Sequence, residues 1–206
     1  MKRKLLAVVA ADMVGFSRLI ENDEIIILSR QKNHFNDVIK PAIENFNGEI
    51  IKTTGDGFLA TFESALDAVE SSIEIQTKIN ALEKIFTREQ RIWYRVGINI
   101  GDVVVDEGDI FGNCVNIASR LESIADAGGI CITSDIFQNI KNLTSYNFKN
   151  LGDQYLKNIT QQINVYKIIV DEEGLNQDNS ISKILTEVDQ EIRYCSSNDG
   201  TIIAYA

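Results

Sequence analysis

The apolar positions of the first 170 residues alternate between short continuous runs and helical stripes. Residues 5–11 form a continuous run of small and β-branched apolar residues, which is typical of a strand covered on both faces. Residues 23–47 instead place apolar side chains at spacings near the helical period, which predicts one long helix or two joined ones. Pro41 lies inside this stretch, and we expect a kink or break there because proline lacks the amide donor.

A β-hairpin is predicted next, because two short apolar runs flank the sequence Gly55-Asp56-Gly57 and glycine supplies the backbone freedom of a tight turn. The stretch from 64 to 85 returns to helical spacing with Ser64 as its expected N-cap. The remaining predicted elements are a strand over 91–105 that bends or turns near Gly97 and Gly101, a helix over 115–125, a strand over 130–133, a short helix over 135–141 and a strand over 163–170. This order predicts an α+β fold with helices on a mostly antiparallel sheet.

The 206 residues predict one main domain with a terminal appendage. We assign residues 1–170 to that domain and 171–191 to a polar linker that contains an amphipathic stretch near its end. Residues 192–206 resume strand-like alternation around Asn198-Asp199-Gly200. Such an apolar hairpin cannot bury itself, so we expect it to begin a further domain or to pack on another subunit.

Composition and charge narrow the classes of partner. Thirty acidic against 20 basic residues give a net charge of −10, which argues against a broad basic surface for nucleic acid or for an anionic membrane. No stretch approaches the length of a membrane span. The three cysteines, Cys114, Cys131 and Cys195, form no C-x-x-C pair, so a reducing cytoplasm is the expected location. The basic start before residue 5 also has the outline of a signal peptide, but its apolar run is short and we favour a buried strand.

Two carboxylates stand at the ends of predicted strands. Asp12 closes the first strand and Asp56 lies in the hairpin turn, so they converge if the hairpin pairs beside that strand. Two such groups repel each other without a counter-charge, and a divalent cation such as Mg²⁺ or Mn²⁺, completed by substrate phosphates, removes the difficulty. The alternative is that each carboxylate only caps or shapes its own turn.

Other segments have weaker signals for phosphate chemistry. The strand-to-helix junction after Met13 offers exposed amides that suit phosphate oxygens, although loops of this kind usually only turn; its residues are Gly15, Phe16 and Ser17. Asn116 and Arg120 are four apart on a predicted helix and share a face. An amide and a guanidinium suit phosphoryl transfer, whereas an isolated pair is more often a solvated polar face.

Isolated residues give weaker evidence about function than these motifs. Arg95 begins an otherwise apolar strand, which favours a buried or phosphate-facing guanidinium. Lys52, Asp109 and Lys157 do not stand out alone. His34 is the only histidine and we assign it no catalytic role. Without a second imidazole or a nucleophile beside a base, metal-assisted phosphoryl transfer is the chemistry that remains.

Four segments together resemble the class III nucleotidyl cyclase domain. They are ADMVGFS at 11–17, KTTGDGFLATF at 52–62, RVGINIGDV at 95–103 and DIFGNCVNIASRLE at 109–122. The resemblance covers about residues 4–170 and implies a ferredoxin-like, palm-type, mostly antiparallel sheet covered by helices. It also implies conversion of a nucleoside triphosphate to the 3′,5′-cyclic monophosphate and pyrophosphate by a head-to-tail dimer with its sites at the interface.

The resemblance extends to single residues. It implies that Asp12, Asp56 and the carbonyl of Met13 bind two Mg²⁺ or Mn²⁺ ions. It further implies that Lys52 and Asp109 contact the base and that Arg95 and Lys157 bind the triphosphate. On the predicted helix, Asn116 would orient the ribose and Arg120 would stabilise the transition state. Because one chain holds all of them, a homodimer would contain two complete sites.

Base preference follows from hydrogen bonding. Adenine presents an acceptor at N1 and a donor at N6, which complement Lys52 and Asp109, whereas guanine presents the reverse. We therefore expect ATP as the substrate. The alternatives are another base, including the UTP or CTP cyclised by phage-defence relatives, and a catalytically silent nucleotide-sensing dimerisation module. The tail after residue 192 resembles the opening strands of an α/β-hydrolase, which predicts a fused C-terminal domain.

Overall fold

The computed structural model describes residues 1–170, 193–196 and 202–205. The chain divides into two compact units, Met1–Val170 and Asp171–Ala206. In the second unit, β9 (Arg193–Ser196) and β10 (Ile202–Tyr205) pair antiparallel. The predicted linker, its amphipathic stretch and the predicted turn at 198–200 lie outside the described residues.

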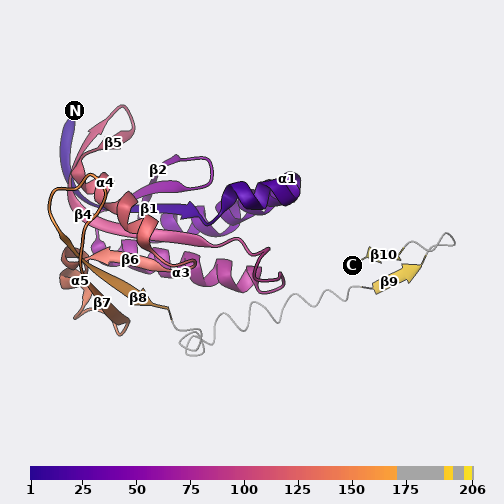
Figure 1. Ribbon diagram of the computed structural model, residues 1–206. Coiled ribbons are helices and arrows are strands. Elements are labelled where there is room, and N and C mark those ends of the chain that lie inside the picture. Colours follow the sequence, from indigo (N-terminus) through magenta and orange to yellow (C-terminus); the bar gives the residue numbers. More distant parts are fainter. Residues whose placement is uncertain (171–192, 197–201, 206) are drawn as a thin grey trace. The chain divides into compact units, whose positions relative to one another are not determined.

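The first unit is built on one sheet with the strand order β2-β3-β1-β4-β6-β8-β7, to which β5 adds beside β4 (Figure 1). Its strands are β1 (Lys2–Met13), β2 (Glu49–Thr53), β3 (Phe58–Phe62), β4 (Tyr94–Asp106), β5 (Asp109–Phe111), β6 (Ile130–Thr133), β7 (Asn147–Gln154) and β8 (Ile163–Ile169). Only the pair β4 and β6 is parallel among these described strands. The expected mostly antiparallel sheet is therefore confirmed.

Strand β1 is central because both of its faces are apolar. Its odd-numbered residues Ala7, Val9 and Ala11 join a core with α1, α3 and α5, whereas Leu6, Val8 and Ala10 join a second core with α4. Successive side chains of a strand point to opposite faces, so helices cover the sheet on both sides. By the same alternation the carboxylate of Asp12 lies on the face of the sheet that α4 covers.

The helices are α1 (Phe16–Asn33), the π-helical segment η1 (His34–Ile39), α2 (Lys40–Asn45), α3 (Ala65–Glu83), α4 (Asn113–Ile124) and α5 (Ser134–Ile140). The irregularity expected near Pro41 takes the form of the π-helical segment that precedes it. The expected start of the first helical stretch was incomplete: α1 begins at Phe16 rather than at residue 23, and Asp23, with non-helical φ and ψ of −161° and 90°, marks a kink within it.

Local signals predicted several boundaries well. Ser64 caps α3, since its Oγ accepts a hydrogen bond from the amide of Asp67 at 3.2 Å. The segment predicted over 91–105 contains one continuous strand, β4 at Tyr94–Asp106, where we expected a bend or a second strand. Strands β5 and β7 were not predicted. No helix among the described residues is long and apolar enough to cross a membrane.

Candidate active site

The carboxylates of Asp12 and Asp56 meet at one end of the sheet. Strand β3 pairs with β1, with Ala11 opposite Phe58, so the turn of the β2–β3 hairpin lies beside the last residues of β1. The two carboxyl groups lie close enough for the charge of Asp56 to raise the pKa of Asp12. The convergence that the sequence indicated is therefore present, while the metal-binding role of the two groups stays a prediction.

Gly57 makes this close approach possible. A Cβ atom at Gly57 would lie 2.1 Å from the carbonyl oxygen of Ala11 and 3.0 Å from Oδ1 of Asp12. Real side chains do not tolerate a 2.1 Å contact with backbone, so any other residue would push the hairpin away from β1. The glycine pattern that predicted the turn thus also sets the distance between the two carboxylates.

Asp12 lies in a setting that disfavours its charge. Partial burial raises the pKa of Asp12, and the charge of Asp56 and the hydrogen bond with it raise the pKa further, against the opposing effects of Arg95 and the Met13 amide. A divalent cation would relieve this repulsion. No cluster of three or more Asp, Glu, His or Cys side chains suited to a metal occurs among the described residues, so backbone and substrate oxygens would have to complete the coordination.

Arg95 lies opposite Asp12 in the β1–β4 register and faces two acids. Its Nη2 is 3.6 Å from Oδ2 of Asp12 and 2.9 Å from Oε1 of Glu122, and its Nη1 donates a hydrogen bond to the carbonyl of Ser123 at 3.4 Å. Burial raises the pKa of Glu122 against the opposing effect of Arg95. Glu122 was not among the predicted site residues, although an acid on the apolar face of a helix, four residues after Ala118, was a visible signal.

Lys52 and Asp109 form a second group. Nζ of Lys52 lies 2.7 Å and 2.8 Å from the two carboxylate oxygens of Asp109, which joins β2 to β5. The hydrogen bond from Lys52, helped by the amide of Ile110, holds the pKa of Asp109 below its ordinary value. The side chains are 44% and 33% exposed, so both remain accessible to a ligand.

Asn116 and Arg120 lie on α4, where Asn116 is exposed and Arg120 half-buried. Nε of Arg120 donates a hydrogen bond to the carbonyl of Lys157 at 3.3 Å, which brings the loop after β7 beside the helix. Within the described part of the chain, no hydrogen bond or ion pair joins Asn116 or Arg120 to Asp12 or Asp56. The predicted residues therefore fall into separate groups in a single chain.

The junction after β1 turns sharply into α1. Gly15 has a positive φ of 66°, and Phe16 and Ser17 follow as the first residues of the helix. The first amides of a helix have no partner within the helix, so this junction presents donors close to Asp12 in the chain. The amide of Val14 donates to the carbonyl of Trp93 at 2.8 Å and fixes the junction to the start of β4.

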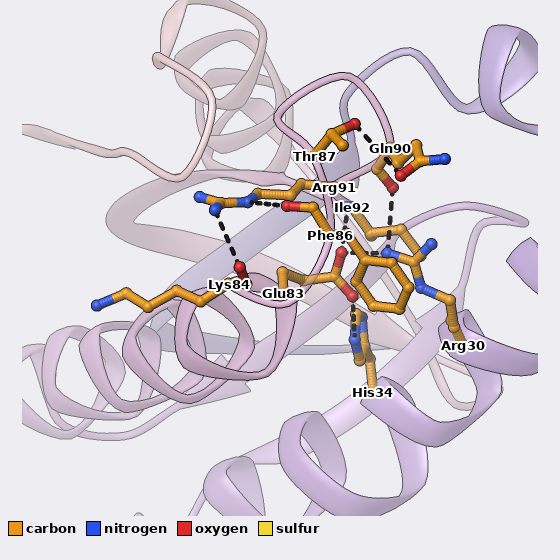
Figure 2. A network of polar contacts seen from close by, with 9 residues as sticks. All are labelled: Arg30, His34, Glu83, Lys84, Phe86, Thr87, Gln90, Arg91 and Ile92. Carbon is orange, nitrogen blue, oxygen red and sulfur yellow. Dashed lines mark hydrogen bonds and ion pairs between the residues drawn. The ribbon is translucent and has the colours of Figure 1, made fainter. Parts of the chain in front are cut away.

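His34 belongs to a separate buried cluster around Glu83 (Figure 2). Nε2 of His34 lies 3.1 Å from Oε1 of Glu83, while Oε2 pairs with Arg30 and accepts a hydrogen bond from the amide of Ile92 at 2.6 Å. Burial opposes the ionisation of Glu83, but the hydrogen bonds from His34, Ile92 and Arg30 outweigh it and hold the pKa below its ordinary value. This cluster joins α1, η1, α3 and the approach to β4.

Comparison with known proteins identifies the fold. The family model for the adenylate and guanylate cyclase catalytic domain matches residues 2–170. Putative adenylate cyclase 3 of Rhizobium meliloti (strain 1021) is 36% identical over 165 residues, which cover 80% of this chain and 28% of that protein. An adenylate cyclase of Streptomyces coelicolor is 34% identical over 127 residues, or 62% of this chain and 32% of that protein. The chain thus aligns with less than a third of either relative's length.

Two crystal structures agree with these relatives. The adenylate/guanylate cyclase/hydrolase from Silicibacter pomeroyi superposes with a TM-score of 0.78 at 46% identity, over 82% of this chain and 99% of that chain. The adenylyl cyclase CyaB from P. aeruginosa gives a TM-score of 0.73 at 25% identity, over 84% of this chain and 97% of that chain. Sequence and fold agree, and the chain belongs to the adenylate and guanylate cyclase catalytic domain family, the class III nucleotidyl cyclases.

Proposed function

We propose that this chain cyclises ATP to 3′,5′-cyclic AMP and pyrophosphate. The observation that carries the proposal is the convergence of Asp12 and Asp56 at the end of β1, where Gly57 lets the hairpin approach Asp12 closely and two carboxylates oppose the guanidinium of Arg95. Such a pair suits divalent cations with phosphate ligands. The adenylate cyclases among the relatives support the choice of reaction.

The residues present fit a pair of Mg²⁺ or Mn²⁺ ions. Asp12 and Asp56 would hold them with the carbonyl of Met13, and the raised pKa of Asp12 reflects the repulsion that a cation would relieve. When bound, such ions supply acidification of the ribose 3′-hydroxyl and charge neutralisation on the phosphates.

The chain's own residues would bind and orient the triphosphate. Arg95 and Lys157 supply positive charge, and the helix start at Gly15, Phe16 and Ser17 supplies amide donors. In this proposal Asn116 orients the ribose for in-line attack. Arg120 would meet the negative charge that builds on the α-phosphoryl group, a contribution of about 3 kcal/mol to lowering the barrier.

The Lys52–Asp109 pair would select the base. The ammonium donates to N1 of adenine and the carboxylate accepts from N6, whereas guanine offers the opposite pattern. Their mutual contacts at 2.7 Å and 2.8 Å put donor and acceptor side by side, as recognition of one base edge requires.

We further propose a cytoplasmic homodimer in which each site takes Asp12 and Asp56 from one subunit and Lys52, Asp109, Asn116 and Arg120 from the other. The separation of these groups within one chain supports this division. A further domain behind residue 191 is proposed as well, in keeping with the greater length of the relatives and with the hydrolase named beside the Silicibacter pomeroyi cyclase.

The test is incubation of the protein with each of the four nucleoside triphosphates and Mn²⁺, followed by identification of the cyclic product. We expect cyclic AMP and pyrophosphate from ATP, with Asp56→Ala protein as the inactive control. Cyclic UMP or cyclic CMP as the main product would mean that the substrate is UTP or CTP rather than ATP. Binding of nucleotide without release of pyrophosphate would contradict catalysis and favour the sensing module.

A further inference from the structure

Glu122 is brought to the candidate site by the close packing of α4 on β4. A Cβ atom at Gly97 would lie 2.1 Å from the carbonyl oxygen of Ala118 and 2.3 Å from the amide nitrogen of Glu122. The backbone of α4 therefore rests directly on the strand. Arg95 is two residues before Gly97 and faces the same side of the sheet, so the helix delivers the Glu122 carboxylate to the Arg95 guanidinium.

The guanidinium of Arg95 lies between two acids and is closer to the one on α4. Nη2 is 2.9 Å from Glu122 and 3.6 Å from Asp12. Nε of Arg95 is buried and has no hydrogen-bond partner among the described residues. The guanidinium donates one long hydrogen bond, to the carbonyl of Ser123. It is therefore held toward α4 mainly by its ion pair with Glu122, a 2.9 Å contact that does not have hydrogen-bond geometry.

The position of the Arg95 guanidinium affects whether the carboxylate of Asp12 is available to a cation. Asp12, Asp56 and Glu122 provide three carboxylates for one guanidinium, and Glu122 is only 8% exposed. If Glu122 lost its charge, Asp12 would be the charged acid that contacts Arg95. Arg95 would then be free to form a bidentate ion pair with Asp12, which is a strong interaction. When paired with Asp12, the guanidinium of Arg95 would compete directly with a cation for the carboxylate oxygens of Asp12.

We propose that Glu122 is a positioning residue that holds Arg95 away from Asp12, so that Asp12 and Asp56 stay available to a divalent cation while the guanidinium stays directed at the substrate phosphates. This inference rests on the metal site of the proposed function. Glu122 acts through Arg95 and touches neither the cation nor the nucleotide.

The experiment measures Mn²⁺ binding to the full chain without nucleotide, by the electron paramagnetic resonance signal of free Mn²⁺. Glu122→Gln should raise the Kd for Mn²⁺ by about tenfold. Glu63→Gln is the matched control, because it removes the same charge from an exposed residue beyond the far end of β3; its Kd should equal that of the wild type. In an Arg95→Gln background, Glu122→Gln should have no further effect, because the competing guanidinium is gone.

The outcomes separate this inference from the proposed function. Wild-type protein that binds no more Mn²⁺ than Asp12→Asn protein would overturn the metal site and the inference together. Normal wild-type binding with no change in Glu122→Gln protein, or a change that persists in the Arg95→Gln background, would overturn the inference alone and leave Glu122 a structural residue. If circular dichroism shows that Glu122→Gln protein does not fold, Glu122→Asp serves instead; its shorter side chain should raise the Kd about threefold, and that rise should vanish with Arg95→Gln.

Discussion

Two acidic clusters in the same domain are built in opposite ways. Glu83 is 1% exposed, yet an arginine, a histidine and a backbone amide all point at its carboxylate and hold its pKa low (Figure 2). Asp12 is less buried, but it has a second carboxylate, Asp56, as a neighbour, and burial together with the charge of Asp56 raises its pKa. The compensated cluster joins four elements of the fold, whereas we propose that the uncompensated one binds a divalent cation.

The largest expected effect comes from removing a carboxylate of the uncompensated cluster. Asp56→Asn should lower the rate of cyclic nucleotide formation by at least about a thousandfold, because a metal ligand contributes several kcal/mol to the transition state. The melting temperature should stay equal or rise, since the substitution removes repulsion with Asp12. Pyrophosphate release and thermal unfolding measure the two effects, with Glu63→Gln as control. Activity within about tenfold of the wild type would refute the assignment.

The compensated cluster should show the reverse behaviour, a loss of stability. Glu83→Gln should lower the free energy of unfolding by about 3 kcal/mol, because it leaves the guanidinium of Arg30 without its counter-charge in a largely buried place. Urea unfolding of the variant beside Glu63→Gln measures this loss. A decrease below about 1 kcal/mol would mean that the ion pairs of Glu83 contribute no more than surface ones.

Glu83→Gln and Asp12→Asn should change the free energy of unfolding at neutral pH in opposite directions, and both effects should fade in acid. The pKa of Glu83 is below its ordinary value of 4.5 in the folded protein, so its contribution to stability is full above pH 4.5 and is lost as the pH falls through the folded value. The penalty of Glu83→Gln should therefore fade in acid. The pKa of Asp12 is above its ordinary value of 3.8, so Asp12→Asn should stabilise the protein at neutral pH, and that gain should fade toward pH 3.8. Unfolding free energies measured between pH 3 and pH 7 would test the predictions for Glu83→Gln and Asp12→Asn. If both substitutions changed the stability in the same direction at neutral pH, the contrast between the two acidic clusters would be wrong.

Much of the fold was predictable because its signals are local. The apolar run of β1, the glycines around Asp56 and the cap at Ser64 each act within a few residues, and each gave the right element. Strand β7 was missed because its sequence is largely polar and partly exposed. The start of α1 was missed because the long-range contacts of Leu19, not an N-cap side chain, fix it.

The convergence of Asp12 and Asp56 was predictable from the sequence, whereas the balance of charges around them was not. The positions of Asp12 and Asp56 followed from strand ends and a turn. The partners of Glu83 and Glu122 did not, because His34, Arg30 and Arg95 come from other elements and reach these acids only after the sheet and helices pack. Both glutamates do lie on apolar helix faces, and this pattern marks acids that need a buried partner.

The most direct test of the central claim mixes two inactive proteins, Asp56→Ala and Asn116→Ala. If each site takes its metal carboxylates from one subunit and Asn116 from the other, a mixed dimer contains one intact site. Equal amounts that exchange subunits freely should then recover about a quarter of the wild-type cyclase activity. Full inactivity of the mixture, with mixed dimers shown to form, would contradict shared sites.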